Sequence, residues 1–116
     1  MLNLGLDRRI WLCTQPTDMR RSFDGLSAQV RRLMGEDPTQ GDWFVFINRR
    51  QTQMRILSYE PGGYALWAKR LEQGQFAGLS ASGEVKQGLS RTALLALIEG
   101  IDVSVKRQRK RYKRAA

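Results

Sequence analysis

Five consecutive apolar residues, Trp43–Ile47, constrain the fold of this chain more than any other segment. In an extended strand their side chains point alternately to two faces, so both faces of the strand must be covered. Residues 48–53 are polar, and residues 54–59 form a second stretch of strand length. We therefore predict a hairpin at the centre of a sheet, with Arg49 and Arg50 at its tip.

The segments on either side of this hairpin predict one further strand and three helices. Residues 9–13 are a short apolar run, which ends before Pro16 because proline cannot extend a central ladder. Helical spacing of apolar residues occurs in three groups: Phe23, Leu26, Val30, Leu33 and Met34; Tyr64, Trp67, Ala68 and Leu71; and Leu94, Leu97, Ile98 and Ile101. Ser90 is placed to cap the last helix, and Gly35 to end the first. The predicted fold is α+β, a small antiparallel sheet with a central hairpin, packed by about three helices.

Charge divides the chain into a body and a tail. The chain carries 20 Lys+Arg and 11 Asp+Glu, a net charge of +9. Seven of the last eleven residues are basic and none is acidic, so removing them leaves 13 basic and 11 acidic residues, a body of +2. We predict a single domain, residues 1–105, followed by a basic tail, residues 106–116. A block of like charge is solvated on its own, and its natural partner is a polyanion such as nucleic acid.

Composition excludes several classes of chemistry. The chain has no histidine, so no Ser-His or Cys-His nucleophile can form. Cys13 is the single cysteine, which excludes an internal disulfide and an ordinary zinc site and favours a reducing compartment. The chain contains no apolar stretch of 18 residues, so we predict no membrane span, and its first residues lack a signal-peptide pattern. We expect a cytoplasmic protein without a cofactor; a bound metal would need carboxylates, which suit magnesium or manganese.

Recurring basic residues provide the candidate nucleic-acid contacts, because a guanidinium group donates two hydrogen bonds to a phosphate. In the body they are Arg20, Arg21, Arg49, Arg50, Lys69 and Arg70, and in the tail they are Lys106, Arg107, Arg109, Lys110, Arg111, Lys113 and Arg114. Basic pairs are also common on ordinary solvated faces, and this alternative is favoured for any single pair. The pair at the hairpin tip is the exception, since a tip projects its side chains freely and a two-stranded ribbon can enter a groove of DNA.

Asp18 and Asp24 are the candidate metal ligands of a nuclease, which needs carboxylates that converge on shared ions. Both lie around the predicted start of a helix, where aspartates are favoured by capping and by the helix dipole. We therefore predict no catalytic residue.

Four stretches of the sequence resemble one protein family. They are DMRRSFDGL at residues 18–26, DPTQG at 37–41, FVFINRR at 44–50 and GYALWAKRLEQGQF at 63–76. In this order they are similar to the small accessory protein, called TnpB or Orf2, of the IS-sixty-six group of bacterial insertion sequences. The resemblance covers about residues 10–76, with a weaker echo at 94–102. Two departures are Gln51, where the family often has a further basic residue, and Ala77-Gly78, near which it often has a Trp-Pro.

The resemblance implies an accessory factor that assists a separate, larger transposase and does not itself perform strand transfer. Its expected partners are DNA, bound through the tail and the Arg49–Arg50 tip, and the transposase subunits of the same element. Two alternatives stay open: a protein adaptor of the transposase that does not bind DNA, and a carboxylate-metal nuclease. The sequence predicts neither the oligomeric state nor the preferred DNA.

Overall fold

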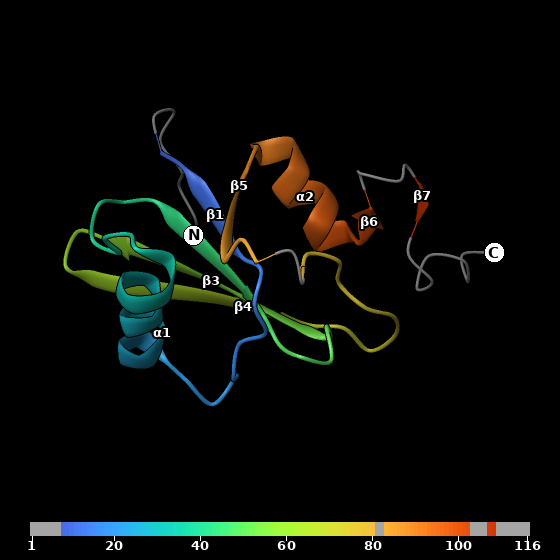
Figure 1. Cartoon of the computed structure of the whole chain (residues 1–116), viewed down its shortest axis with the longest axis horizontal. Coiled ribbons are helices and arrows are strands. Elements are labelled where there is room, and N and C mark those ends of the chain that lie inside the picture. The colour runs from blue at the N-terminus through green and yellow to red at the C-terminus, as the bar shows by residue number, and fades with distance from the viewer. Residues whose placement is uncertain (1–7, 81–82, 103–106, 109–116) are drawn as a thin grey trace.

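The computed structural model describes residues 8–80, 83–102 and 107–108 of the chain. A five-stranded sheet forms its centre, with the strand order β4-β3-β2-β1-β5 (Figure 1). The strands are β1 (Ile10–Cys13), β2 (Trp43–Ile47), β3 (Gln53–Glu60), β4 (Gly63–Arg70) and β5 (Lys86–Leu89). The helical segments of the described residues are α1 (Phe23–Gln29), which continues into the π-helical η1 (Val30–Met34), and α2 (Arg91–Glu99). Two short strands, β6 (Ile101–Asp102) and β7 (Arg107–Gln108), pair with each other.

The sheet is mixed, so the prediction of an antiparallel sheet was wrong. β1 and β2 run parallel, with Ile10 opposite Trp43, whereas the other neighbouring strands of the sheet are antiparallel. The helix of α1 and η1 lies between β1 and β2 in the chain and carries it back to the end of the sheet where β1 began. The next strand then runs in the same direction as β1. The orientation of this pair follows from the path of the connection, which no local pattern reveals.

The central hairpin of β2 and β3 is confirmed. In its loop, the side-chain oxygen of Asn48 accepts hydrogen bonds from the backbone N–H groups of Thr52 at 2.8 Å and Gln53 at 2.9 Å. Asn48 thus satisfies two donors that the turn leaves without a strand partner. The loop is fixed by these bonds, and the side chains of Arg49 and Arg50 remain exposed on it.

The segment of residues 64–71 is a strand for most of its length, so the prediction of a helix there was wrong. The turn at Pro61-Gly62 returns the chain alongside β3, and all eight residues of β4 pair with it, from Gly63 opposite Glu60 to Arg70 opposite Gln53. The side chains of the segment fit both a helical spacing and a strand alternation, and its tyrosine and tryptophan suit a strand. The hydrogen-bond ladder to β3 decides between the two. Consequently the described residues contain two helical segments, and not about three helices.

Each face of the sheet has its own core, as the apolar run in β2 requires. Phe44 and Phe46 point to the face that α1 and η1 cover, whereas Val45 and Ile47 point to the face that α2 covers. The buried residues of the first core are Cys13, Leu26, Val30, Met34, Phe44, Phe46 and Leu57. Those of the second core are Ile10, Leu12, Val45, Ile47, Met54, Ile56, Phe76, Leu94 and Leu97. Each such side chain stabilises the fold by about 1.5–3 kcal/mol relative to an exposed position, so β2 anchors both layers.

The helix ends follow the sequence signals. The side chain of Ser90 accepts a hydrogen bond from the backbone N–H of Ala93 at 3.0 Å, which confirms the predicted cap of α2. Gly35 and Gly100 end the two helical segments with φ angles of 68° and 88°, a left-handed conformation that glycine adopts without strain. Ile101, which the helical spacing assigned to the last helix, therefore lies beyond α2 in β6. Ser22 precedes α1, but its side chain makes no capping hydrogen bond. Among the described residues, no helix has the length and apolar character needed to cross a membrane.

Candidate nucleic-acid interface

Three arginines from two distant parts of the chain meet in one groove. Arg20 and Arg21 lie in the loop before α1, and Arg49 lies at the tip of the β2–β3 hairpin. The backbone N–H of Thr17 donates to the carbonyl of Ile47 at 2.9 Å, which ties this loop to the end of β2. The groove encloses about 520 Å³, and its lining is completed by Pro16, Thr17, Asp18, Gln29 and Leu33. Two basic pairs that are separate in the sequence therefore contribute to one surface, which we call the arginine groove.

Arg20 is positioned by Asp18. Its guanidinium group donates to both carboxylate oxygens, with the shortest contact at 2.7 Å, and its backbone N–H donates to the same carboxylate at 2.9 Å. The hydrogen bonds from the Arg20 side chain and backbone lower the pKa of Asp18 from 3.8 to about 2, so Asp18 is ionised at neutral pH. The Arg20 side chain is 91% exposed. Arg20 is therefore accessible to a ligand, with its charge partly balanced by Asp18.

Arg21 is held from two sides. Its guanidinium group donates to the side-chain oxygen of Gln29, and the amide of Gln29, which is buried, donates to the hydroxyl of Thr17 at 2.9 Å. The guanidinium group of Arg55 donates to the backbone carbonyl of Arg21 at 2.8 Å. Arg55 thus places a fourth cation beside the groove, and the sequence prediction missed it. Its signal was a single charged residue inside the apolar alternation of a predicted strand.

The structure separates the two arginines of the hairpin tip. Arg49 lines the arginine groove, and Arg50 does not. Both side chains are exposed, and within residues 8–80 and 83–102 neither guanidinium group has an ion pair or a hydrogen bond. The tip itself is anchored, because the side chain of Gln75 donates to the carbonyl of Arg50 at 3.1 Å and the side chain of Gln51 donates to that of Phe76 at 3.0 Å. Gln51, one of the two departures from the family pattern, therefore has a structural contact of its own.

Lys69 and Arg70 do not line the arginine groove. The ammonium group of Lys69 donates to the carbonyl of Ile98 at 3.3 Å, near the C-terminal end of α2, where a cation is favoured by the helix dipole. Arg70 forms an exposed ion pair with Glu72 at 3.5 Å. Of the predicted tail contacts, only Arg107 is among the described residues, and only its backbone, as part of β7. The other predicted tail contacts lie outside the described residues: Lys106, Arg109, Lys110, Arg111, Lys113 and Arg114.

The two candidate metal ligands have separate surroundings. Asp18 is bound by Arg20, as described above, and Asp24 lies in the first turn of α1. Within the part of the chain that the structure describes, no three His, Cys, Asp or Glu side chains form a group that could hold a metal ion.

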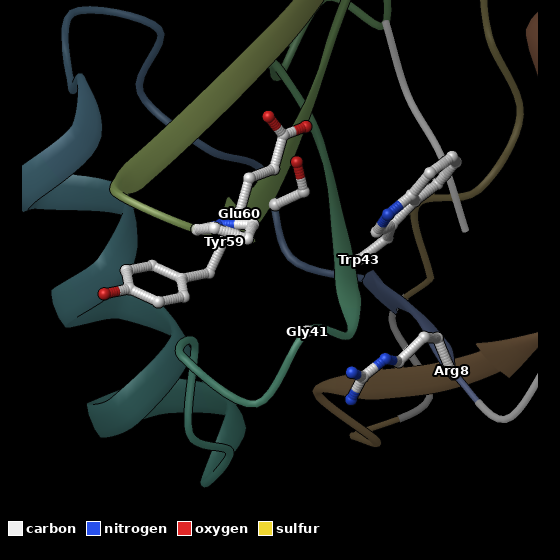
Figure 2. Close-up of a pocket in the computed structure, with 7 residues that line it drawn as sticks. Arg8, Gly41, Trp43, Tyr59 and Glu60 are labelled. Carbon is white, nitrogen blue, oxygen red and sulfur yellow. The ribbon is translucent and has the colours of Figure 1, made fainter. Parts of the chain in front are cut away.

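A second hollow, of about 310 Å³, lies beside the start of β2 and the turn between β3 and β4. Figure 2 shows the guanidinium group of Arg8 directed towards Gly41, with Trp43 on the same side and the ring of Tyr59 turned towards α1. Gly41 has a φ of 94°, and a Cβ there would lie 2.7 Å from the Cζ of Arg8, so glycine permits this approach. The lining holds one basic residue, Arg8, and one acidic residue, Glu60. This balance contrasts with the arginine groove, whose lining has three basic residues and one acidic residue.

Comparison with known proteins identifies the family. The family model described as IS66 Orf2 like protein matches residues 8–108. The chain belongs to the IS66 Orf2-like family. The uncharacterized protein y4hO of Sinorhizobium fredii is 34% identical over 102 residues, which cover 88% of each chain. The uncharacterized protein y4jC of the same organism is 41% identical over 68 residues, which cover 59% of this chain and 58% of y4jC. No solved structure matches.

Membership in the family confirms the resemblance that the four sequence stretches indicated. It gives this IS66 Orf2-like protein an accessory role associated with transposition. The family match includes every residue that lines the arginine groove, since the groove lies within residues 16–49.

Proposed function

We propose that this protein is a non-catalytic accessory factor that binds DNA and assists a separate transposase. The family supports the accessory role. The proposal of a DNA contact rests on one observation: Arg20, Arg21 and Arg49 line a single groove whose only acidic residue is Asp18. The lining therefore carries three positive charges against one negative charge.

The arginine groove suits a phosphate backbone better than it suits the edges of bases. A guanidinium group donates two parallel hydrogen bonds to a phosphate, and such contacts fix the orientation of a protein on a duplex without reading its sequence. Arg21 is already oriented by Gln29. Arg49 has no competing ion pair among the described residues. The groove thus presents both an oriented and a freely available guanidinium group to a phosphate.

The tail contributes the larger share of the attraction in this proposal. Each Lys or Arg that neutralises a phosphate of duplex DNA releases condensed counterions and adds about −0.9 to the log-log salt dependence of binding. Seven basic tail residues account for at most about −6 of this slope, and the three groove arginines for at most about −3. The tail therefore provides attraction at many positions along the DNA, while the groove orients the folded body.

Binding of labelled duplex DNA at several salt concentrations, followed by fluorescence anisotropy, tests the proposal. We expect the logarithm of the binding constant to fall linearly with the logarithm of salt concentration. A parallel pull-down compares two baits, the DNA alone and the transposase subunits. We expect the protein to be retained by each of them. An adaptor is retained by the subunits and shows no salt-dependent binding to DNA, and that result would replace the proposal.

The non-catalytic part of the proposal has its own test. The protein is incubated with duplex and single-stranded DNA in the presence of magnesium or manganese, and both substrates are expected to stay intact. Cleavage that disappears in Asp18→Ala or Asp24→Ala would establish a carboxylate-metal nuclease instead.

A further inference from the structure

The outer edge of β4 presents a row of backbone groups to its surroundings. The backbone N–H of Leu71 donates to the carbonyl of Thr52 at 2.8 Å. Because hydrogen bonds alternate along an antiparallel ladder, residues 65, 67 and 69 also bond to β3. The residues whose N–H and C=O groups point outward are then Tyr64, Leu66, Ala68 and Arg70. β4 is the last strand of the sheet, and no strand among the described residues pairs with this edge.

The edge lacks most of the features by which monomeric proteins protect such strands, and its two charged residues, Lys69 and Arg70, lie together at the C-terminal end of β4. Proline, a bulge, a very short strand or an inward-pointing charge commonly prevents edge-to-edge pairing. β4 has eight residues without a proline, and it pairs with β3 at every position without a bulge. The opposite edge strand, β5, has four residues, one of which is Gly88. Of the two edges, β4 is the one suited to receive another strand.

We infer that β4 pairs with β4 of a second copy of this chain, antiparallel, about a two-fold axis that passes midway between the two copies of Trp67. Only the residues whose backbone groups point outward, Tyr64, Leu66, Ala68 and Arg70, can form hydrogen bonds across this edge. This outward set must therefore pair with the outward set of the second copy. Centring the pair on Trp67 places Tyr64 opposite Arg70 and Leu66 opposite Ala68 of the second copy. This register uses the whole set: four residues in each copy, each with one N–H and one C=O, make eight hydrogen bonds. Either neighbouring register places one end of the set opposite a turn or loop.

The side chains of the outward set complement one another in this register. The guanidinium group of Arg70 meets the ring of Tyr64, which is a favourable cation–π pair. The large side chain of Leu66 meets the small side chain of Ala68, and no two like charges lie directly opposite. A strand from an unrelated protein can use the same backbone groups, but this pattern of size and charge matches the strand itself.

The pairing also places the two arginine grooves relative to each other, and the significance of that placement rests on the proposed function. A two-fold axis perpendicular to the sheet leaves the same face of both copies on the same side. The side chains of these four outward-facing residues lie on the face covered by α1, because Leu66 packs against that core. The arginine groove is on the same face, since Gln29 of α1 and Leu33 of η1 line it. The two grooves therefore lie on one side of a continuous sheet. The pairing itself does not depend on DNA binding, and its test uses no DNA.

The first test is the mass of the protein in solution, measured by sedimentation equilibrium. We expect twice the 13.3 kDa of one chain. Ala68→Pro removes one outward N–H and leaves the ladder to β3 intact, since proline is tolerated on a strand whose N–H faces away from the sheet. This variant should keep its circular dichroism and sediment as a monomer, whereas the matched control Ala68→Val keeps the N–H and should remain a dimer. A monomeric parent protein, or a folded Ala68→Pro variant that is still a dimer, would overturn the inference.

The second test fixes the register and does not depend on a proline. Leu66→Cys and Ala68→Cys are prepared as two separate proteins and then mixed under mild oxidation. In the proposed register these residues of different copies lie about 5.5 Å apart between Cα atoms, within the range of a disulfide, whereas identical positions are about 7–8 Å apart. The mixture should form a covalent dimer, and each protein alone should not. The native Cys13 is fully buried and does not compete. Cross-linking of either protein alone, or of neither combination, contradicts the register.

Discussion

The two arginines of the hairpin tip offer the sharpest test of the arginine groove, because they are neighbours with the same charge and different surroundings. Arg49 lines the groove and Arg50 does not. If Arg49 contacts one phosphate, Arg49→Ala should flatten the log-log salt slope of duplex binding by about 0.9. Over a fourfold increase in salt, from about 50 to about 200 mM, the affinity advantage of the parent protein over this variant should then shrink by about 3.5-fold.

The assay is the salt titration by fluorescence anisotropy, with Arg50→Ala as the matched control. Both variants lose one exposed positive charge from the same loop, so a difference between them reports on the groove and not on net charge. We expect Arg50→Ala to leave the slope within about 0.3 of the parent value, and the double variant to flatten it by no more than about two. Equal effects of the two single substitutions would refute the groove as the contact surface. No effect of either substitution would restrict DNA binding to the tail.

Three further predictions concern the tail, Asp18 and Ser90. Truncation after Val105 should flatten the salt slope by three to six units, by the counterion estimate of about 0.9 per contact, while the melting temperature stays within a few degrees. Asp18→Asn frees Arg20 and should steepen the slope by up to about 0.9. Because the folded-state pKa of Asp18 is about 2, its stabilising contribution is present above about pH 4 and is lost as the pH falls towards 2. In acid unfolding, the Asp18→Asn variant should therefore lose less stability than the parent protein as the pH falls from about 4 towards 2. Ser90→Ala should cost about 1 kcal/mol in urea unfolding, whereas the exposed Thr92→Ala should cost less.

Several features of this protein are determined by short stretches of its sequence. Trp43–Ile47 is apolar at every position, and a strand of that kind is stable only when both its faces are covered. Ser90 and Gly100 fix the two ends of α2 through contacts within a few residues. The tight turn at Pro61-Gly62 is equally local. In each case the signal lies within a few consecutive residues, so the local pattern predicts a buried strand, a helix end or a turn. The residues that cover the two faces of β2 nevertheless come from distant segments.

The state of residues 64–71 and the direction of β1 required the tertiary structure. The segment from Tyr64 to Leu71 fits a helix and a strand alike, and only the free edge of β3 selects the strand. β1 and β2 are parallel because a helix connects them, and β5 joins β1 after more than seventy intervening residues. Such pairings depend on segments that are distant in the chain, and the propensity of a single segment is too weak to override them.

The sequence identified the basic pairs of the candidate site but not their arrangement. It correctly proposed an exposed hairpin tip, but it treated Arg49 and Arg50 as one unit and omitted Arg55. The hydrogen bond from Thr17 to Ile47 brings the loop of Arg20 and Arg21 to Arg49, and Arg55 is joined to that loop through the carbonyl of Arg21. Residue type and exposure follow from local sequence, because charge is a property of each side chain. Convergence of charges into a groove follows only from the packing of the loop against the end of β2, since those contacts join residues about thirty positions apart.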